Sequence, residues 1–221
     1  YTEDIYVGYR YFETFARDKV KYPFGFGLSY TRFQTETMGL AVRGTEVTAI
    51  EKVTNVGGVS GRETIQVYVE APQGKLGKPL RQLVAYAKTE DLKPGESEEL
   101  VLKAELTEFA SYDDSGVTGH KSCYVLEAGD YIFYVGTDVR SAREVGRVTL
   151  AELQVVRTAT EALAPVQAFK RLRPFFFGEN DHAIANWEDV PLRTIDLAER
   201  ILRERPTQSE YVGDQGWKLA D

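Results

Sequence analysis

Residues 61–70 read GRETIQVYVE, and this stretch indicates the fold class. Its apolar β-branched residues stand at every second position: Ile65, Val67 and Val69. Alternation with period two is typical of a β-strand that buries one face, and it places Gln66 and Tyr68 on the other face. We therefore predict a strand over residues 63–70, with Ile65, Val67 and Val69 turned towards a core.

More strands are expected on both sides of this one. Leu100, Leu102 and Ala104 alternate with polar neighbours, and the aromatic run 130–135 directly follows Gly129. Further strand candidates are residues 35–43, 46–54, 80–88, 122–127 and 147–156. The turn signals between strands are Asn55-Val56-Gly57-Gly58, Pro72-Gln73-Gly74, Lys93-Pro94-Gly95 and Ala128-Gly129-Asp130. Seven or eight short strands at near-regular spacing predict a mainly β protein, an antiparallel sandwich of fibronectin III or immunoglobulin type.

The chain divides into three zones. Residues 1–33 are dense in aromatics and glycine, residues 34–156 carry the strand patterns, and residues 157–221 lose the alternation. We expect this last zone to be irregular except for a short helix that begins near Thr194 or Asp196 and ends before Pro206. The aromatics of residues 1–33 predict either self-association into a homo-oligomer or docking of this segment onto the sandwich.

Composition excludes several classes of protein. Of 221 residues, 43% are hydrophobic, which is enough for a core, and the formal charge is −7, which argues against nucleic acid as a partner. The longest apolar runs, Leu83–Ala87 and Tyr131–Val135, have five residues, too few for a membrane span of roughly 20. The single cysteine allows no internal disulfide, and with no leader ahead of Tyr1 the expected location is cytoplasmic. A start at Tyr rather than Met leads us to expect a piece of a longer protein.

Individual residues give little support for a catalytic or cofactor-binding site. His120 and His182 have no partner motif, and Cys123 lies in a predicted strand, where a thiol usually packs as a small hydrophobe. Gly25-Phe26-Gly27 lacks the third glycine of a phosphate loop, so we interpret it as a turn between packed aromatics. The acidic loop Asp113–Gly116, with Glu108, lacks calcium-loop spacing and is predicted to be a solvated turn.

Other groups of residues do not select a reaction either. The basic residues Arg62, Lys75, Lys78 and Arg81 stand among acidic neighbours, which disfavours a nucleic-acid patch. With 34 acidic residues, no carboxylate pair stands out for acid–base work. The sequence therefore predicts no catalytic, metal or cofactor-binding residue in this chain.

Two passages near the beginning resemble glycoside hydrolase family 3, the β-glucosidase and β-xylosidase group. Residues 1–12, YTEDIYVGYRYF, look like the end of that family's α/β sandwich domain, with Asp4 in place of the usual glycine. Residues 22–31, YPFGFGLSYT, look like the PFGYGLSYT motif that follows. The middle zone is similar to the family's fibronectin III-like domain at residues 53–57, 61–69, 92–96 and 126–131.

This resemblance implies a retaining, exo-acting β-glycosidase that hydrolyses terminal β-linked sugars with two carboxylates about 5–5.5 Å apart. In the family the nucleophilic Asp lies on a barrel and the acid/base Glu in the α/β sandwich domain. Neither motif occurs here, so no catalytic residue is carried onto this chain. The implied domains are 1–33, the end of the α/β sandwich domain; 34–156, the fibronectin III-like domain; and 157–221, a linker. The implied partners are the catalytic domains of the same polypeptide and its β-linked glycoside substrate.

The tail resembles the linker of permuted members, in which the barrel follows the other domains. The matching stretches are 164–169 and 190–197, and 213–221 would lead into the barrel. The alternative from another class is a carbohydrate-binding or adhesion β-sandwich module. That module would need an exposed aromatic platform, for which the candidates are Tyr68, Tyr86 and Tyr112.

Overall fold

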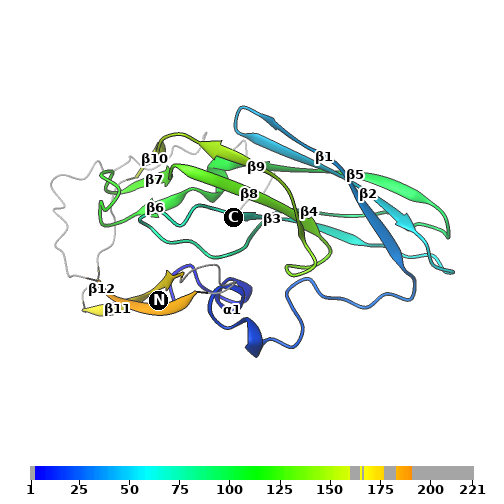
Figure 1. Cartoon of the computed structure of the whole chain (residues 1–221), viewed down its shortest axis with the longest axis horizontal. Coiled ribbons are helices and arrows are strands. Elements are labelled where there is room, and N and C mark those ends of the chain that lie inside the picture. The colour runs from blue at the N-terminus through cyan, green and yellow to red at the C-terminus, as the bar shows by residue number, and fades with distance from the viewer. Residues whose placement is uncertain (1–2, 160–164, 166, 177–182, 191–221) are drawn as a thin grey trace, which may run out of the picture.

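The structure, a computed structural model, describes residues 3–159, 165, 167–176 and 183–190. Two antiparallel sheets lie face to face and form a sandwich (Figure 1). The first has the strand order β1-β2-β5: β1 is Phe33–Arg43, β2 is Glu46–Asn55 and β5 is Ser97–Glu105. The second has the order β4-β3-β8-β9: β4 is Gln82–Lys88, β3 is Thr64–Glu70, β8 is Gly129–Gly136 and β9 is Arg143–Leu150. The predicted antiparallel sandwich is confirmed.

The core lies between these two sheets. Strand β2 alternates strictly between half-buried and buried residues, as a strand with one inward face must. The sheets meet through fully buried side chains that include Val53, Ile65, Val67, Leu102, Tyr131 and Phe133. The inward face predicted for residues 63–70 is therefore confirmed.

The opposite face of β3 differs from the prediction of one buried face. Gln66 and Tyr68 are also buried, at 6% and 0% exposed. The alternation of apolar residues in β3 indicates which face of the strand is turned to the core. It does not indicate whether another segment covers the outer face. That segment is the N-terminal one described below.

A small third sheet extends one end of the sandwich, with the order β10-β7-β6: β10 is Gln154–Thr158, β7 is Cys123–Leu126 and β6 is Ser111–Asp113. The 3-10 turn η2, Leu106–Phe109, leads into it. The single strand expected over residues 147–156 is wrong. The chain bends at residues 151–153, so that β9 pairs with β8 and β10 pairs with β7.

The N-terminal segment and part of the tail lie together outside the sandwich (Figure 1). The N-terminal segment forms a short helix, α1, Tyr9–Phe15, and a 3-10 turn, η1, Arg17–Lys19. Within the tail, β11, Phe169–Phe175, pairs with β12, Ile184–Val190, so the expectation of an irregular tail is wrong over this stretch. Its pattern is weak because the ribbon buries few side chains and places Pro174 in a strand that has only one partner.

Two further expectations concern helices: one in the tail, and one that could span a membrane. The helix predicted from Thr194 or Asp196 lies outside the described residues. Within the described ranges, none of the helices combines the length and apolarity that crossing a membrane requires.

Candidate functional site

The N-terminal segment is docked on the outer face of the β4-β3-β8-β9 sheet. The Tyr9 ring packs edge-on against Tyr68, with centroids 6.2 Å apart, and the Leu83 amide donates to Tyr9 Oη at 2.8 Å. Tyr9 also stacks on Phe24 at 4.5 Å. Of the two outcomes expected for residues 1–33, docking onto the sandwich is therefore the one that the structure shows within a single chain.

Gly25 permits the close approach of this segment. A Cβ atom at position 25 would lie 2.4 Å from Gln66 Nε2, and φ is +90°, a backbone conformation that favours glycine. Gln66 is itself fixed, because its Nε2 donates to the Thr137 carbonyl at 2.7 Å and its Oε1 accepts from Tyr68 Oη. The interpretation of Gly25-Phe26-Gly27 as a turn among packed aromatics fits this geometry.

Helix α1 joins three separate parts of the chain. Thr14 is fully buried; its Oγ1 accepts from the Leu80 amide at 3.0 Å, and its carbonyl accepts from the Ala183 amide at 2.7 Å. Next to it, Glu13 pairs with Arg140 of the β8–β9 turn. The helix thus connects the sandwich to the β11–β12 ribbon.

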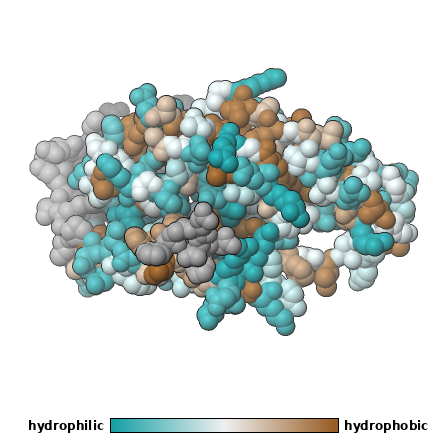
Figure 2. All heavy atoms as spheres, viewed as in Figure 1, coloured by the Kyte–Doolittle hydropathy of each residue, from teal (hydrophilic) through white to brown (hydrophobic). Residues whose placement is uncertain are grey.

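Despite this docking, the segment keeps several large apolar side chains exposed, and we call this set the N-terminal apolar surface. Its members are at least 38% exposed: Ile5, Val7, Phe12, Tyr22, Phe24, Phe26, Leu28 and Tyr30. Leu28 and Tyr30 are almost wholly in solvent, at 92% and 102%. Figure 2 shows hydrophobic side chains at the surface beneath the right-hand part of the sandwich, where Figure 1 places the chain leading into β1. Exposed apolar side chains gathered in one segment are typical of contact sites.

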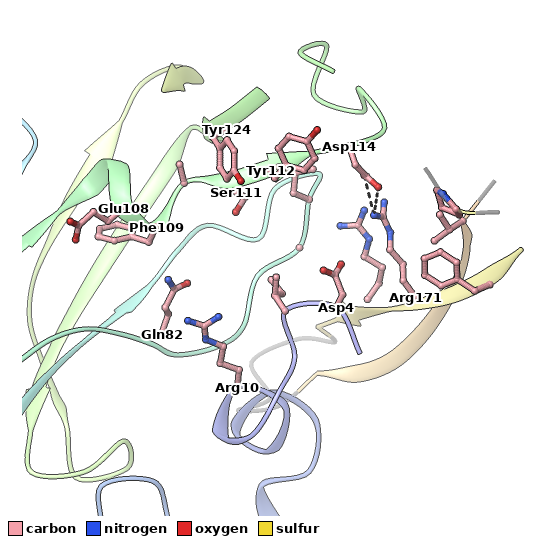
Figure 3. Close-up of a pocket in the computed structure, with 18 of the residues that line it drawn as sticks. Asp4, Arg10, Gln82, Glu108, Phe109, Ser111, Tyr112, Asp114, Tyr124 and Arg171 are labelled. Atoms are coloured by element: carbon pink, nitrogen blue, oxygen red, sulfur yellow. Dashed lines mark hydrogen bonds and ion pairs between the residues drawn. The ribbon is translucent and has the colours of Figure 1, made fainter. Parts of the chain in front are cut away.

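A cleft of about 790 Å³ lies between the sandwich, the N-terminal segment and the β11–β12 ribbon. Figure 3 shows Arg10 entering it from α1, Tyr112 and Tyr124 from β6 and β7, and Arg171 from β11. Arg171 Nη1 lies 3.0 Å from both carboxylate oxygens of Asp114, so these two charges neutralise each other. The cleft thus combines the Arg171–Asp114 ion pair with the rings of Tyr112 and Tyr124.

A buried ion pair supports the loop beside this cleft. Lys78 and Glu127 are 4% and 5% exposed and pair with each other, and Glu127 also accepts from the Lys75 amide at 2.7 Å. Burial lowers the pKa of Lys78, although Glu127 acts in the opposite direction. The pair holds the β3–β4 loop in place, and Leu76 of that loop lines the cleft.

Of the histidine and cysteine candidates, the structure describes His120 and Cys123. His120 is exposed in a turn, and His182 lies outside the described residues. Cys123 is buried in β7 and packs with Val125 and Leu76, as predicted for a small hydrophobe. In the described ranges, no group of three or more His, Cys, Asp and Glu residues could hold a metal ion.

The acidic loop is a turn, as predicted, but its first residue is not solvated. Asp113 is 0% exposed, and its carboxylate accepts from the Gly116 amide at 2.6 Å and from the Thr118 amide and hydroxyl at 2.8 and 2.6 Å. Burial alone would raise the pKa of Asp113, but these donors outweigh it and hold the pKa below its usual value. Asp113 therefore stabilises its own turn.

Three of the four basic candidates, Arg62, Lys78 and Arg81, form ion pairs. Arg62 pairs with Glu90, and Arg81 pairs with Glu70 while its guanidinium lies 3.5 Å from the Tyr134 ring centroid. With Lys78 bound to Glu127, these residues do not form a basic patch.

The proposed aromatic platform is not present as predicted. Tyr68 is buried beneath the N-terminal segment, Tyr86 is 72% exposed on β4, and Tyr112 packs against Tyr124 beside the cleft. The cleft residues Arg10, Arg171 and Arg173 were not predicted, because they come from two zones whose contact no local sequence pattern reveals.

Comparisons with known proteins agree with this architecture. The model of the fibronectin type III-like domain matches residues 63–139. A β-glucosidase of Ruminococcus albus is 46% identical over the whole of this chain, which spans 23% of that protein's length. The chain is homologous to one segment of family 3 β-glucosidases.

Solved structures support the same assignment to a family 3 segment. A β-glucosidase from Paenibacillus barengoltzii superposes with a TM-score of 0.86 and 52% identity, over 90% of this chain and 23% of that one. A family 3 β-glucosidase from Bifidobacterium adolescentis gives 0.57 and 36%, over 67% of this chain and 21% of that one. The chain thus spans about a quarter of these relatives' length and includes their fibronectin-like domain.

Proposed function

We propose that this family 3 segment is a non-catalytic, structural part of a retaining, exo-acting β-glycosidase that hydrolyses terminal β-linked sugars. The observation that carries the proposal is the N-terminal apolar surface, which stays exposed after the segment has docked on its own sandwich. The partner that fits it is the set of catalytic domains of the same polypeptide, because most of the length of the R. albus relative lies outside the matched region.

Leaving these side chains in water forgoes the free energy that their burial would gain. Each large apolar side chain that is buried gains about 1.5–3 kcal/mol relative to exposure. Leu28 and Tyr30 gain almost nothing in this chain. Contact with a neighbouring domain would bury both, so the fibronectin-like sandwich would brace the catalytic domains through the segment that α1 fixes to it.

The carbohydrate-binding or adhesion alternative is less well supported. Sugar-binding platforms need several aromatic rings on one face, and of the three tyrosines considered, Tyr68 is buried. Tyr86 and Tyr112 lie on different sheets, on β4 and β6. A structural role accounts for more of the exposed aromatics.

Domain order is a further part of the proposal. We place the nucleophile-bearing barrel after Asp221 and the acid/base Glu before Tyr1, with residues 157–221 as connector. The β11–β12 ribbon supports this, because it lies against α1 through the Ala183–Thr14 hydrogen bond and so runs back along the first domain. Reading the gene on both sides tests it: a barrel encoded upstream of Tyr1 would contradict this order.

An activity assay tests the non-catalytic role. The purified chain should give no protein-dependent turnover of nitrophenyl β-glucoside or β-xyloside, whereas the longer polypeptide encoded by the gene should turn over at least one of them. Turnover that copurifies with the chain through two different columns would overturn the proposal. Inactivity of the longer polypeptide on all β-glycosides tested would overturn the assignment of the reaction.

A further inference from the structure

Glu51 is an acidic side chain in a row of core positions. It lies on β2 between Ala49 and Val53, which are 2% and 0% exposed, and it is itself 3% exposed. In the register of the first sheet Thr37 lies opposite Glu51 and Thr35 opposite Val53, so both threonines share its face. A carboxyl group in such a position destabilises the fold unless a partner compensates it.

That compensation is incomplete within the described chain. Glu51 Oε2 is buried and has no hydrogen-bond partner among the described residues. Burial raises the pKa of Glu51; the hydroxyls of Thr37 and Thr35 act against this, and Glu36 adds to it. Unsatisfied buried polar atoms are few in native proteins, and each calls for an explanation.

The explanation lies in the space that Glu51 lines. A pocket of about 400 Å³ is bounded by β1, β2, the end of β8 and the turn into β9. Its lining is mostly polar: Thr35, Thr37, Glu51, Thr137, Ser141 and Arg143, with Val135 and Gly136. The pairing of β1 with β2 shifts by a residue between Thr37 and Gly39, directly beside Glu51. Bulges of this kind often re-aim side chains next to functional sites.

Charge and hydrogen-bonding capacity restrict the ligand. The carboxyl group of Glu51 disfavours a bound anion. A bound cation would be repelled by the guanidinium of exposed Arg143 and would have only one carboxylate as ligand. Hydroxyl groups satisfy both, because they donate to Glu51 Oε2 and accept from Arg143, while the threonine and serine hydroxyls can do either. The volume lies within the roughly 300–1,000 Å³ of small-molecule sites.

We propose that this pocket, which we call the Glu51 pocket, binds a neutral polyhydroxylated molecule of monosaccharide size. The site is separate from the cleft between the sandwich and the ribbon, and the two share no lining residue. It does not depend on the structural role proposed above, because binding is measured on the chain itself and catalysis is not required.

Titration of the isotope-labelled chain with D-glucose, D-xylose and glycerol, followed by amide NMR shifts, tests the proposal. We expect saturable shifts confined to the amides of Thr35, Thr37, Glu51, Thr137 and Ser141. Arg143 is exposed, so Arg143→Ala should fold normally and weaken binding about tenfold, the loss expected for one charge-assisted hydrogen bond. Glu46→Gln, an outward change on the same strand, is the matched control and should leave the affinity unchanged.

Glu51→Met separates binding from structure. If the carboxyl group serves a ligand, the variant should lose the sugar-induced shifts and melt at the same or a higher temperature, because it removes an unsatisfied buried polar atom. A lower melting temperature with unchanged shifts would show that Glu51 is structural and overturn the proposal. Absence of shifts with all three polyols, or shifts with calcium chloride or sodium sulfate instead, would also overturn it.

Discussion

Arg140 and Glu13 lie 127 positions apart in the sequence and form a bidentate ion pair. Arg140 Nε lies 3.0 and 3.1 Å from the two Glu13 carboxylate oxygens, and Nη2 lies 2.9 Å from one of them. Arg140 Nη2 also donates to the Arg17 carbonyl at 2.8 Å. A single side chain of the sandwich therefore fixes both α1 and the η1 turn that follows it, and through them the N-terminal apolar surface.

Replacing this arginine should release the N-terminal segment. Because the Glu13 side chain is only 4% exposed, Arg140→Ala leaves a buried carboxylate without its main partner. We expect the free energy of unfolding to fall by about 2–4 kcal/mol, and amides of α1 to exchange faster with solvent. Urea unfolding and hydrogen exchange measure the two effects.

Arg147→Ala is the control for this change. Arg147 also makes two ion pairs, with Asp130 and Glu144, but its side chain is 49% exposed. Exposed pairs contribute about 0–1 kcal/mol, so the loss should be small. Equal losses for the two variants would contradict the role assigned to Arg140.

Asp113 should make stability depend on pH at the acidic end. Its pKa is lower in the folded chain than the ordinary value, so its contribution is complete above about pH 4 and is lost as the pH falls through the folded pKa. Asp113→Asn should therefore lower the free energy of unfolding by about 2–3 kcal/mol near neutral pH. The difference between the two proteins should shrink below about pH 4. A difference that stays constant down to pH 3 would contradict this account.

Asn55 should be more important for stability than its place in a turn sequence suggests. It is 0% exposed; its Oδ1 accepts from the Thr31 hydroxyl at 2.8 Å, and its Nδ2 donates to the Val59 and Leu92 carbonyls at 2.8 and 2.7 Å. Asn55→Ala should cost about 2–4 kcal/mol in thermal or urea unfolding. Thr54→Ala, which removes an exposed hydroxyl contact with Ser97, should cost less than about 1 kcal/mol. Similar costs would refute the special role of Asn55.

The strands that a local pattern specifies were predictable, and those that depend on a distant partner were not. Residues 46–54 alternate because one side of β2 faces the core, and the predicted range falls within the observed Glu46–Asn55. The β11–β12 ribbon buries Leu172 but leaves most of β12 exposed, so its residues need no alternation and were expected to be irregular. The outer face of β3 was predicted incompletely for a related reason, since its cover comes from 40 or more positions away.

The candidate sites show the same division. Neither the cleft nor the N-terminal apolar surface follows from a sequence motif, since both depend on how the zones of the chain pack together. One signal was available: Glu51 interrupts the inward row Val47, Ala49, Val53. An acidic residue at a core position indicates a pocket or a compensating partner. The alternating pattern of residues 46–54 places Glu51 at such a position.

The most direct test of the central claim is hydrogen–deuterium exchange of residues 22–30, compared between the isolated chain and the longer polypeptide encoded by its gene. If the N-terminal apolar surface docks on the catalytic domains, these amides should exchange rapidly in the chain and slowly in the longer polypeptide, while β3 is slow in both. Equal, rapid exchange of residues 22–30 in the two proteins would contradict the claim that this surface braces the enzyme.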